Sequence, residues 1–221
     1  MDLSLKNNFI KRLVSSIIIL PILFFIIYYG YIFFLSLLII IAIISFYELK
    51  NISFNNLIFV FSLLIIALFL YSSWELRNMQ NGFYLTLFVL FICIFTDIGG
   101  YIFGKTFKGP KISHISPNKT YSGMIGSFLL PTIVIFFFLN SNSNSEIYYK
   151  IIFLYNLNIF LTIFIISLVS QLGDFMISYL KRKSNIKDTG NIIPGHGGLL
   201  DRIDGIIFAT IFYYLLIKIN I

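Results

Sequence analysis

The sequence predicts an all-α membrane protein, a polytopic bundle of about seven transmembrane helices that forms a single domain. Hydrophobic residues make up 58% of the chain, its mean hydropathy is +0.93, and only 11% of its residues are charged. A water-soluble core could not hide that much apolar surface and still leave a polar exterior. The apolar runs recur along nearly the whole length, which leaves no room for a separate soluble domain.

Seven apolar runs are candidates for membrane spans. They cover residues 13–29, 31–47, 57–71, 83–98, 124–139, 151–169 and 206–219. Several are shorter than the roughly 20 residues that a bilayer requires, so we expect some to extend into their polar flanks or to stop part-way across. Lys6, Lys11 and Arg12 precede the first run, as in a signal peptide, but no small-residue cleavage site follows. This pattern predicts a retained first span.

Basic residues predict the orientation of the spans. With the N-terminus in the cytoplasm, all but three of the 16 Lys and Arg residues fall on the cytoplasmic side, the exceptions being Arg77, Lys150 and Lys218. Cytoplasmic loops of membrane proteins carry such an excess. We therefore expect the two large basic loops, 99–123 and 171–204, to face the cytoplasm, and the protein to lie in a bacterial inner membrane.

Charge and cysteine content argue against two classes of function. A net charge of +7 could indicate nucleic-acid binding, but in a chain with many spans it marks cytoplasmic loops and contact with anionic membrane lipids. Cys93 is the only cysteine and lies inside an apolar run, so the chain has no disulfide framework and no cysteine-based metal site. We expect membrane lipids as partners and no nucleic acid.

A polar stripe continues from the sixth run into the second basic loop. Its members, spaced by 4, 3, 4 and 3 residues, are Ser167, Gln171, Asp174, Ser178 and Lys181. This spacing places them on one face of a helix. A carboxylate on that face points into the bundle or a watery cavity, because facing lipid is costly. An interfacial helix that turns its polar side to water is the alternative.

Asp201 and Asp204 lie three residues apart before the last run, on one face if a helix starts near Leu199. Two such carboxylates suit Mg²⁺, which prefers hard oxygen ligands and usually binds one or two carboxylates plus substrate phosphates. Alternatively, they are acids at a helix start that complement its dipole, with Arg202 as a surface charge.

The glycine-rich stretch PGHGG over 194–198 is a candidate phosphate cradle. Its backbone can adopt positive φ and direct amide N–H groups at an anion. A simple turn is the alternative, but Lys187 and Arg202 on either side favour phosphate chemistry, which needs oriented donors and charge neutralisation. His196 is a candidate contact to a phosphate or to the hydration shell of a metal ion.

The first basic loop carries Lys105, Lys108 and Lys111, followed by SPNKTYSG over 116–123. These lysines could simply contact anionic lipid headgroups. Asp97, at the end of an apolar run, is the stronger candidate. Acids within spans are functional candidates by default. The alternative is that Asp97 has no role other than an ion pair with a lysine.

The run over 178–204 resembles the signature of the phosphatidate cytidylyltransferases, or CDP-diacylglycerol synthases. The residues in register are Ser178, Lys181, Arg182, Lys187, Asp188, Gly190, Pro194, His196, Gly197, Gly198, Asp201, Arg202 and Asp204. DIGGYIFGK over 97–105 and ISPNKTYSG over 115–123 are similar to two further elements of that family. The chain departs from the family in being short and in Tyr121, where tryptophan is more common.

The resemblance implies transfer of CMP from CTP to phosphatidic acid, which forms CDP-diacylglycerol and releases pyrophosphate. The lipid phosphate is itself the nucleophile, so the site has to hold two anions together and neutralise the leaving group. We expect spans over 1–95 and a catalytic half over 96–221. CTP and phosphatidic acid are the expected partners, and a homodimer is a further expectation.

The predicted site residues divide into two sets. Asp174, Asp201, Asp204 and Lys187 are assigned to catalysis, with Asp174 and Asp201 as Mg²⁺ ligands and Asp204 as a further ligand or an orienter of Arg202. The substrate-binding set is Asp97, Lys119, Ser178, Lys181, Arg182, Gly195, His196, Gly197, Gly198 and Arg202.

Two other functions stay open at this point. One is a related CTP-dependent membrane transferase or kinase that acts on an isoprenoid lipid. The other is a transporter or channel, with Asp97 and Asp174 as ion-pathway groups. The density of candidate phosphate-binding residues and the absence of an internal repeat in the sequence disfavour a transporter.

Overall fold

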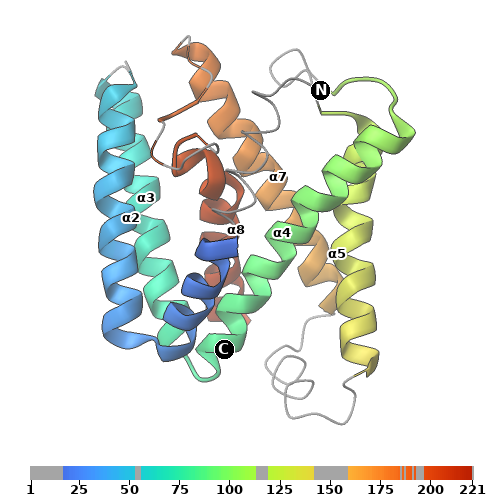
Figure 1. The fold of residues 1–221 in the computed structure, drawn as a ribbon, viewed down its shortest axis with the longest axis horizontal. Coiled ribbons are helices and arrows are strands. Elements are labelled where there is room, and N and C mark those ends of the chain that lie inside the picture. Colours follow the sequence, from blue (N-terminus) through green and yellow to red (C-terminus); the bar gives the residue numbers. More distant parts are fainter. Residues whose placement is uncertain are drawn as a thin grey trace.

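The computed structural model describes residues 17–52, 56–112, 119–141, 159–184, 186, 188–190, 192 and 197–220. These residues contain seven helices. They are Ile17–Tyr29, α2 (Tyr31–Asn51), α3 (Asn56–Asn78), α4 (Gly82–Phe107), α5 (Tyr121–Ser141), α7 (Ile159–Lys183) and α8 (Leu200–Asn220). An isolated antiparallel β-bridge joins Lys111 and Thr120. The predicted all-α class is confirmed (Figure 1).

Each predicted span coincides with one of these helices, although the starts of the runs 13–29 and 151–169 lie outside the described residues. Five helices, α2, α3, α4, α5 and α7, are long and apolar enough to cross a membrane. The helix Ile17–Tyr29 is shorter, and α8 is not among the five. The membrane class is therefore confirmed, while the number of spans stays a prediction.

Two helices run far beyond the predicted span ends. α4 continues to Phe107 and α7 to Lys183, so much of both basic loops is helical. Hydrophobicity marks only the part of a helix that faces lipid. A helix whose polar side chains line a cavity has no physical reason to stop where the apolar run stops. The candidate site residues Asp174, Ser178 and Lys181 therefore stand on a helix.

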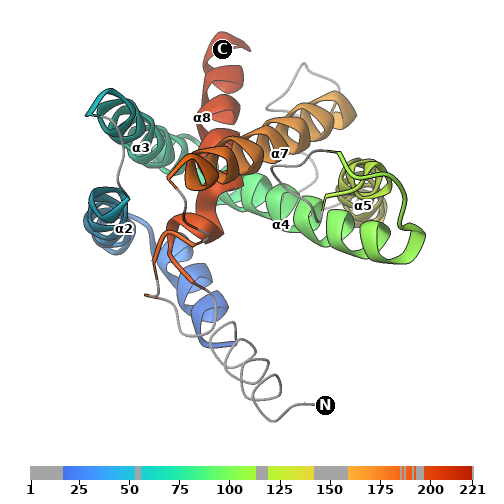
Figure 2. The ribbon, with the colours of Figure 1, turned by 90° about the horizontal axis from the view of Figure 1, so that it is seen from above.

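The helices are arranged with α7 and α8 in the middle. α2 and α3 pack together on one side and α4 and α5 on the other (Figures 1 and 2). Ile92 of α4, Ile163 of α7 and Tyr213 of α8 are fully buried in the core between them. Large side chains such as Ile32 of α2 face outward. Helices that are hydrophobic all round are typical of a membrane bundle.

α4 and α5 approach each other through glycines. A Cβ atom at Gly99 would lie 2.3 Å from the carbonyl oxygen of Gly126, and one at Gly126 would lie 2.4 Å from the Phe103 side chain. Small residues at such positions let membrane helices pack closely. The glycines after Asp97 therefore have a packing role that the motif alone did not reveal.

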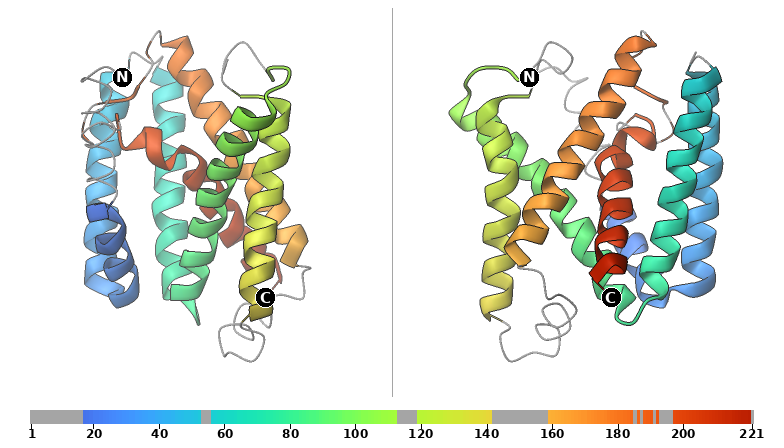
Figure 3. Two further views of the ribbon diagram at one scale, coloured as in Figure 1. Left: turned by 45° about the vertical axis from the view of Figure 1, so that its right-hand side comes forward. Right: turned by 180° about the vertical axis from the view of Figure 1, so that it is seen from behind.

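One end of the bundle collects the positive charge, and we call it the basic end. The C-terminal ends of α2, α4 and α7 and the N-terminal ends of α3, α5 and α8 lie toward it (Figure 3). The last turns of α2, α4 and α7 carry Lys50, Lys105, Lys181, Arg182 and Lys183. The opposite end has Arg77 and Lys218 in the last turns of α3 and α8. The two predicted basic loops therefore share one end of the molecule.

Candidate active site

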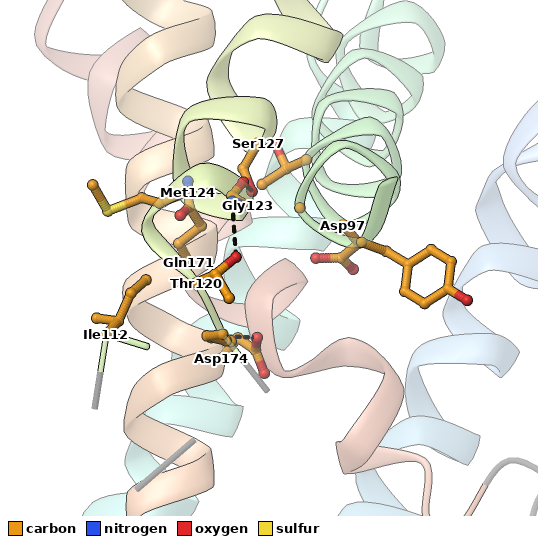
Figure 4. A pocket seen from close by; sticks show the side chains of 12 residues that line it. Asp97, Ile112, Thr120, Gly123, Met124, Ser127, Gln171 and Asp174 are labelled. Atoms are coloured by element: carbon orange, nitrogen blue, oxygen red, sulfur yellow. Dashed lines mark hydrogen bonds and ion pairs between the residues drawn. The ribbon is translucent and has the colours of Figure 1, made fainter. Parts of the chain in front are cut away.

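A polar cavity of about 270 Å³ lies between α4, α5 and α7 toward the basic end (Figure 4). The residues that line it are Thr96, Asp97, Gly100, Tyr101, Ile112, Lys119, Thr120, Gly123, Met124, Ser127, Gln171 and Asp174. Three predicted site residues, Asp97, Lys119 and Asp174, thus come together from separate parts of the sequence. They form the wall of one cavity.

The connection between α4 and α5 fixes the position of Lys119. The amide N–H of Ile112 donates to the carbonyl of Lys119 at 2.9 Å, next to the bridge between Lys111 and Thr120. The Thr120 hydroxyl in turn accepts a hydrogen bond from the amide N–H of Gly123 at 3.2 Å (Figure 4). A threonine that accepts from the first turn in this way caps a helix. The backbone of Lys119 is therefore held on both sides.

Lys119 forms an ion pair with Asp174 across the cavity. Lys119 belongs to the first basic loop and Asp174 to α7, 55 residues later. Both side chains keep about a third of their surface exposed, at 32% and 30%. A pair this open can exchange partners when an anion or a cation arrives, because solvent screens it.

The carboxyl group of Asp204, on α8, lies in hydrogen-bonding contact with that of Asp174. Asp97 is close enough to interact electrostatically with Asp174, Lys119 and Arg202. Two carboxyl groups in contact cannot both stay ionised without a proton or a cation between them. This corner of the cavity therefore has an excess of negative charge that suits a cation.

Asp201, the other predicted metal ligand, has different partners. Its Oδ1 accepts a hydrogen bond from Lys181 Nζ at 2.8 Å, and its Oδ2 accepts from the amide groups of Thr189 and Gly198 at 2.8 and 3.1 Å. Only 6% of its side chain is exposed. Asp201 thus joins the end of α7, the following loop and the start of α8. Its assignment to Mg²⁺ stays a prediction.

The other predicted residues lie around this region. Arg182 is exposed and donates to the carbonyl of Ile186 at 3.2 Å, Ser178 is half-buried on α7, and Arg202 is exposed at the start of α8. Gly197 has a φ of +89°, the positive value expected for the cradle. Lys187, Gly195 and His196 lie outside the described residues, so their roles stay predictions.

The described part of the chain contains no group of three or more His, Cys, Asp and Glu side chains arranged to hold a metal ion. The oxygen atoms of Asp174 and Asp204 nevertheless form a hard-oxygen pair. Mg²⁺ usually takes one or two carboxylates and completes its shell with water and substrate phosphates. The pair fits that pattern, and Mg²⁺ stays a prediction.

Sequence reasoning missed Glu48. It lies near the end of α2, is 2% exposed, and accepts a hydrogen bond from the Thr189 hydroxyl at 2.9 Å. The signal was present, because Glu48 is an acid directly after an apolar run, as Asp97 is. Its neighbour Lys50 made the segment resemble an ordinary charged flank.

Residues 52–220 match the model of the cytidylyltransferase family. The chain belongs to this family. The phosphatidate cytidylyltransferase of Rickettsia conorii is 35% identical over 96% of this chain and 92% of its own length. Those of Bacillus subtilis and Haemophilus influenzae are 35% and 33% identical over 66% and 60% of this chain, and over 52% and 45% of their own lengths.

Membership in the cytidylyltransferase family confirms the resemblance seen in the motifs. The matched region contains every predicted site residue, including those of the cavity and of the loop before α8. Glu48 lies just before it.

Proposed function

We propose that this protein transfers CMP from CTP to phosphatidic acid, forming CDP-diacylglycerol and pyrophosphate. The observation that carries the proposal is the contact of Lys119 and Asp204 with Asp174. It brings the family-like segments 115–123 and 178–204 together beside the cavity that Asp97 of the segment 97–105 also lines, in a chain of the cytidylyltransferase family. Relatives that are 33% to 35% identical to it over the aligned residues are named phosphatidate cytidylyltransferase.

The reaction requires neutralisation of charge more than it requires a protein nucleophile. An oxygen of the lipid phosphate forms a bond to the α-phosphorus of CTP, and the bond from that phosphorus to the bridging oxygen of the β-phosphate breaks. Lys119 is placed to bind one of the phosphates once it releases Asp174. Arg182 and Arg202, both exposed toward the basic end, are placed to attract the triphosphate.

Asp174 and Asp204 are the residues that we propose to hold Mg²⁺. Their contact favours Asp204 over Asp201 as the partner of Asp174, because the oxygens of Asp201 already accept three hydrogen bonds. When bound, the ion would neutralise charge on the phosphates of the two substrates. Asp97, in electrostatic range of Asp174, would add to the negative potential that retains it.

We propose that the basic end faces the cytoplasm, in the inner membrane of a bacterium. The support is the asymmetry between the two ends of the bundle, which follows the rule for cytoplasmic loops. CTP is a cytosolic nucleotide, so the orientation and the substrate agree. A homodimer stays a prediction from the sequence.

The decisive test is incubation of the purified protein in detergent with labelled CTP, Mg²⁺ and phosphatidic acid. We expect labelled CDP-diacylglycerol and a matching amount of pyrophosphate. A parallel reaction receives a polyprenol in place of phosphatidic acid. Product from the polyprenol and none from phosphatidic acid would overturn the proposal in favour of an isoprenoid-lipid enzyme.

A further inference from the structure

Glu48 contacts the loop before α8 from the N-terminal part of the chain. Its Oε1 accepts a hydrogen bond from the amide of Leu199 at 2.7 Å, and its Oε2 accepts from the amide of Leu200 and the hydroxyl of Thr189, both at 2.9 Å. The first amides of a helix have no partner within the helix. A carboxylate from α2 therefore caps the start of α8 in place of a neighbouring residue.

The loop before α8 has glycines at the positions where the Glu48 carboxylate lies close to it. A Cβ atom at Gly198 would lie 2.9 Å from Glu48 Oε1, and one at Gly190 would lie 3.1 Å from it. A Cβ atom at Gly198 would also lie 2.1 Å from the Thr189 hydroxyl oxygen, so this position has no room for a side chain where Thr189 and Glu48 meet, whereas at Gly190 the fit against Glu48 is only tight. Gly190 and Gly198 belong to the family-like signature, so part of that signature accommodates a side chain of α2.

Glu48 and Asp201 hold the same short piece of backbone from opposite directions. Thr189 donates its hydroxyl to Glu48 and its amide to Asp201. Gly198 donates its amide to Asp201, and the next two amides donate to Glu48. The start of α8 is thus fixed on both sides, and Asp204 follows within one turn. The placement of Asp204 against Asp174 depends on where that turn begins.

A simple cap would not require a buried charge. Asparagine, serine or threonine caps helices without the cost of removing a carboxylate from water. A buried carboxylate with three donors instead fixes several groups at once, because each donor would lose its bond to Glu48 if the loop shifted. The arrangement favours geometric precision at the start of α8.

We propose that Glu48 is a positioning residue for CMP transfer. It fixes the backbone positions of residues 189–190 and 198–200. Through them it fixes the positions of Asp201 and Asp204 relative to Asp174. This inference rests on the proposed function. It assigns part of the active-site framework to α2, in the N-terminal region where the sequence predicted only spans.

The test compares Glu48→Gln, Glu48→Asp and the control Ser45→Ala in purified protein. Ser45 is one turn earlier on α2 and fully buried, and its hydroxyl has no hydrogen-bond partner among the residues that the structure describes. We expect Glu48→Gln to lower kcat by about 10- to 100-fold, the size typical of losing an orienting partner. The KM for CTP should change little, whereas the melting temperature should fall, because a buried donor then faces the N–H₂ group of the amide. Glu48→Asp should recover part of the rate, and Ser45→Ala all of it.

A second variant tests the connection to the loop. Thr189→Val removes the hydroxyl that donates to Glu48 and keeps the amide that donates to Asp201. If Glu48 acts through this loop, the effects of Thr189→Val and Glu48→Gln on kcat are less than additive. If Glu48→Gln does not accumulate as folded protein, Thr189→Val alone decides. A lowered kcat then supports the proposal and a wild-type kcat overturns it.

The outcomes separate this inference from the proposed function. A wild-type protein that makes no CDP-diacylglycerol overturns the proposed function. An active wild type with an equally active Glu48→Gln variant overturns only the positioning role. A Glu48→Gln variant that melts earlier but has unchanged kcat per folded molecule also overturns it, because Glu48 would then only stabilise the fold.

Discussion

The carboxylates near the basic end form two clusters with opposite character. In the cavity cluster, Asp174 and Asp204 lie against each other, and Asp174 keeps 30% of its side chain exposed. In the loop cluster, Asp201 and Glu48 are nearly buried, and each accepts three hydrogen bonds. Like charges left in contact and open to solvent are suited to bind a ligand. Carboxylates saturated with donors are suited to hold a backbone in place.

The largest effect is expected in the cavity cluster. Asp174→Asn should lower the rate of CDP-diacylglycerol formation by about 100-fold or more, as when an electrostatic group at the reacting centre is lost. It should not lower the melting temperature, because it relieves the contact between two carboxyl groups. Rate and thermal unfolding are measured on the same detergent preparation.

Glu75→Gln is the control for this variant, since it neutralises a carboxylate near the end of α3 that lies away from the basic end. It should keep the wild-type rate. Turnover by Asp174→Asn at a rate close to wild type would remove Asp174 from the chemistry.

Lys119→Met should have the next largest effect. A hydrogen bond to a charged group contributes about 1.5–3 kcal/mol, so kcat/KM should fall by roughly 10- to 100-fold. Lys108→Met is the matched control, because Lys108 is an exposed lysine of the same connection that does not line the cavity. Equal losses in both variants would indicate that the loop acts only through its overall charge.

Asp201→Asn separates the two clusters most directly. It breaks a nearly buried ion pair with Lys181, and breaking such a pair commonly costs about 3–5 kcal/mol. We expect a clear fall in melting temperature and a loss of turnover per folded molecule of only about tenfold. Loss of all turnover at an unchanged melting temperature would instead support Asp201 as a metal ligand.

The smallest effect is expected from Lys218→Met. Lys218 lies in the last turn of α8, away from the basic end, where it contacts Tyr214. Its removal should change kcat and KM by less than about twofold, because ordinary ionic strength screens charges over such a distance. A larger change would show that the two ends of the bundle are coupled.

Hydrophobicity was sufficient to locate the helices but not to find their ends. The run 83–98 lies within α4, and the described part of the run 151–169, residues 159–169, lies within α7, yet both helices continue through polar sequence to Phe107 and Lys183. Lipid contact ends where the apolar run ends, whereas the hydrogen bonds of a helix do not. The extension of α4 and the contacts of Gly99 and Gly126 depend on packing partners that the sequence does not name.

Sequence reasoning predicted which residues come together in the candidate site, but not which of them contact each other. Asp97, Lys119 and Asp174 were all chosen, and they do line one cavity. Spacing placed Asp201 and Asp204 on one helical face, but residues three apart still differ by about 60° around the helix axis. That rotation directs Asp204 to Asp174 and Asp201 to Lys181. Glu48 was missed because its partners lie more than 140 residues away.

The depth of the cavity cluster affects the two reactants unequally. Asp174 precedes the end of α7 at Lys183 by about two and a half turns, or roughly 13 Å along the helix. In the proposed reaction, the phosphates of CTP reach Asp174 from the basic end, among helices α4, α5 and α7. A membrane lipid already resides beside those helices. In the proposed reaction, nucleotide and pyrophosphate therefore pass through the basic end, whereas the lipid approaches from the side of the bundle.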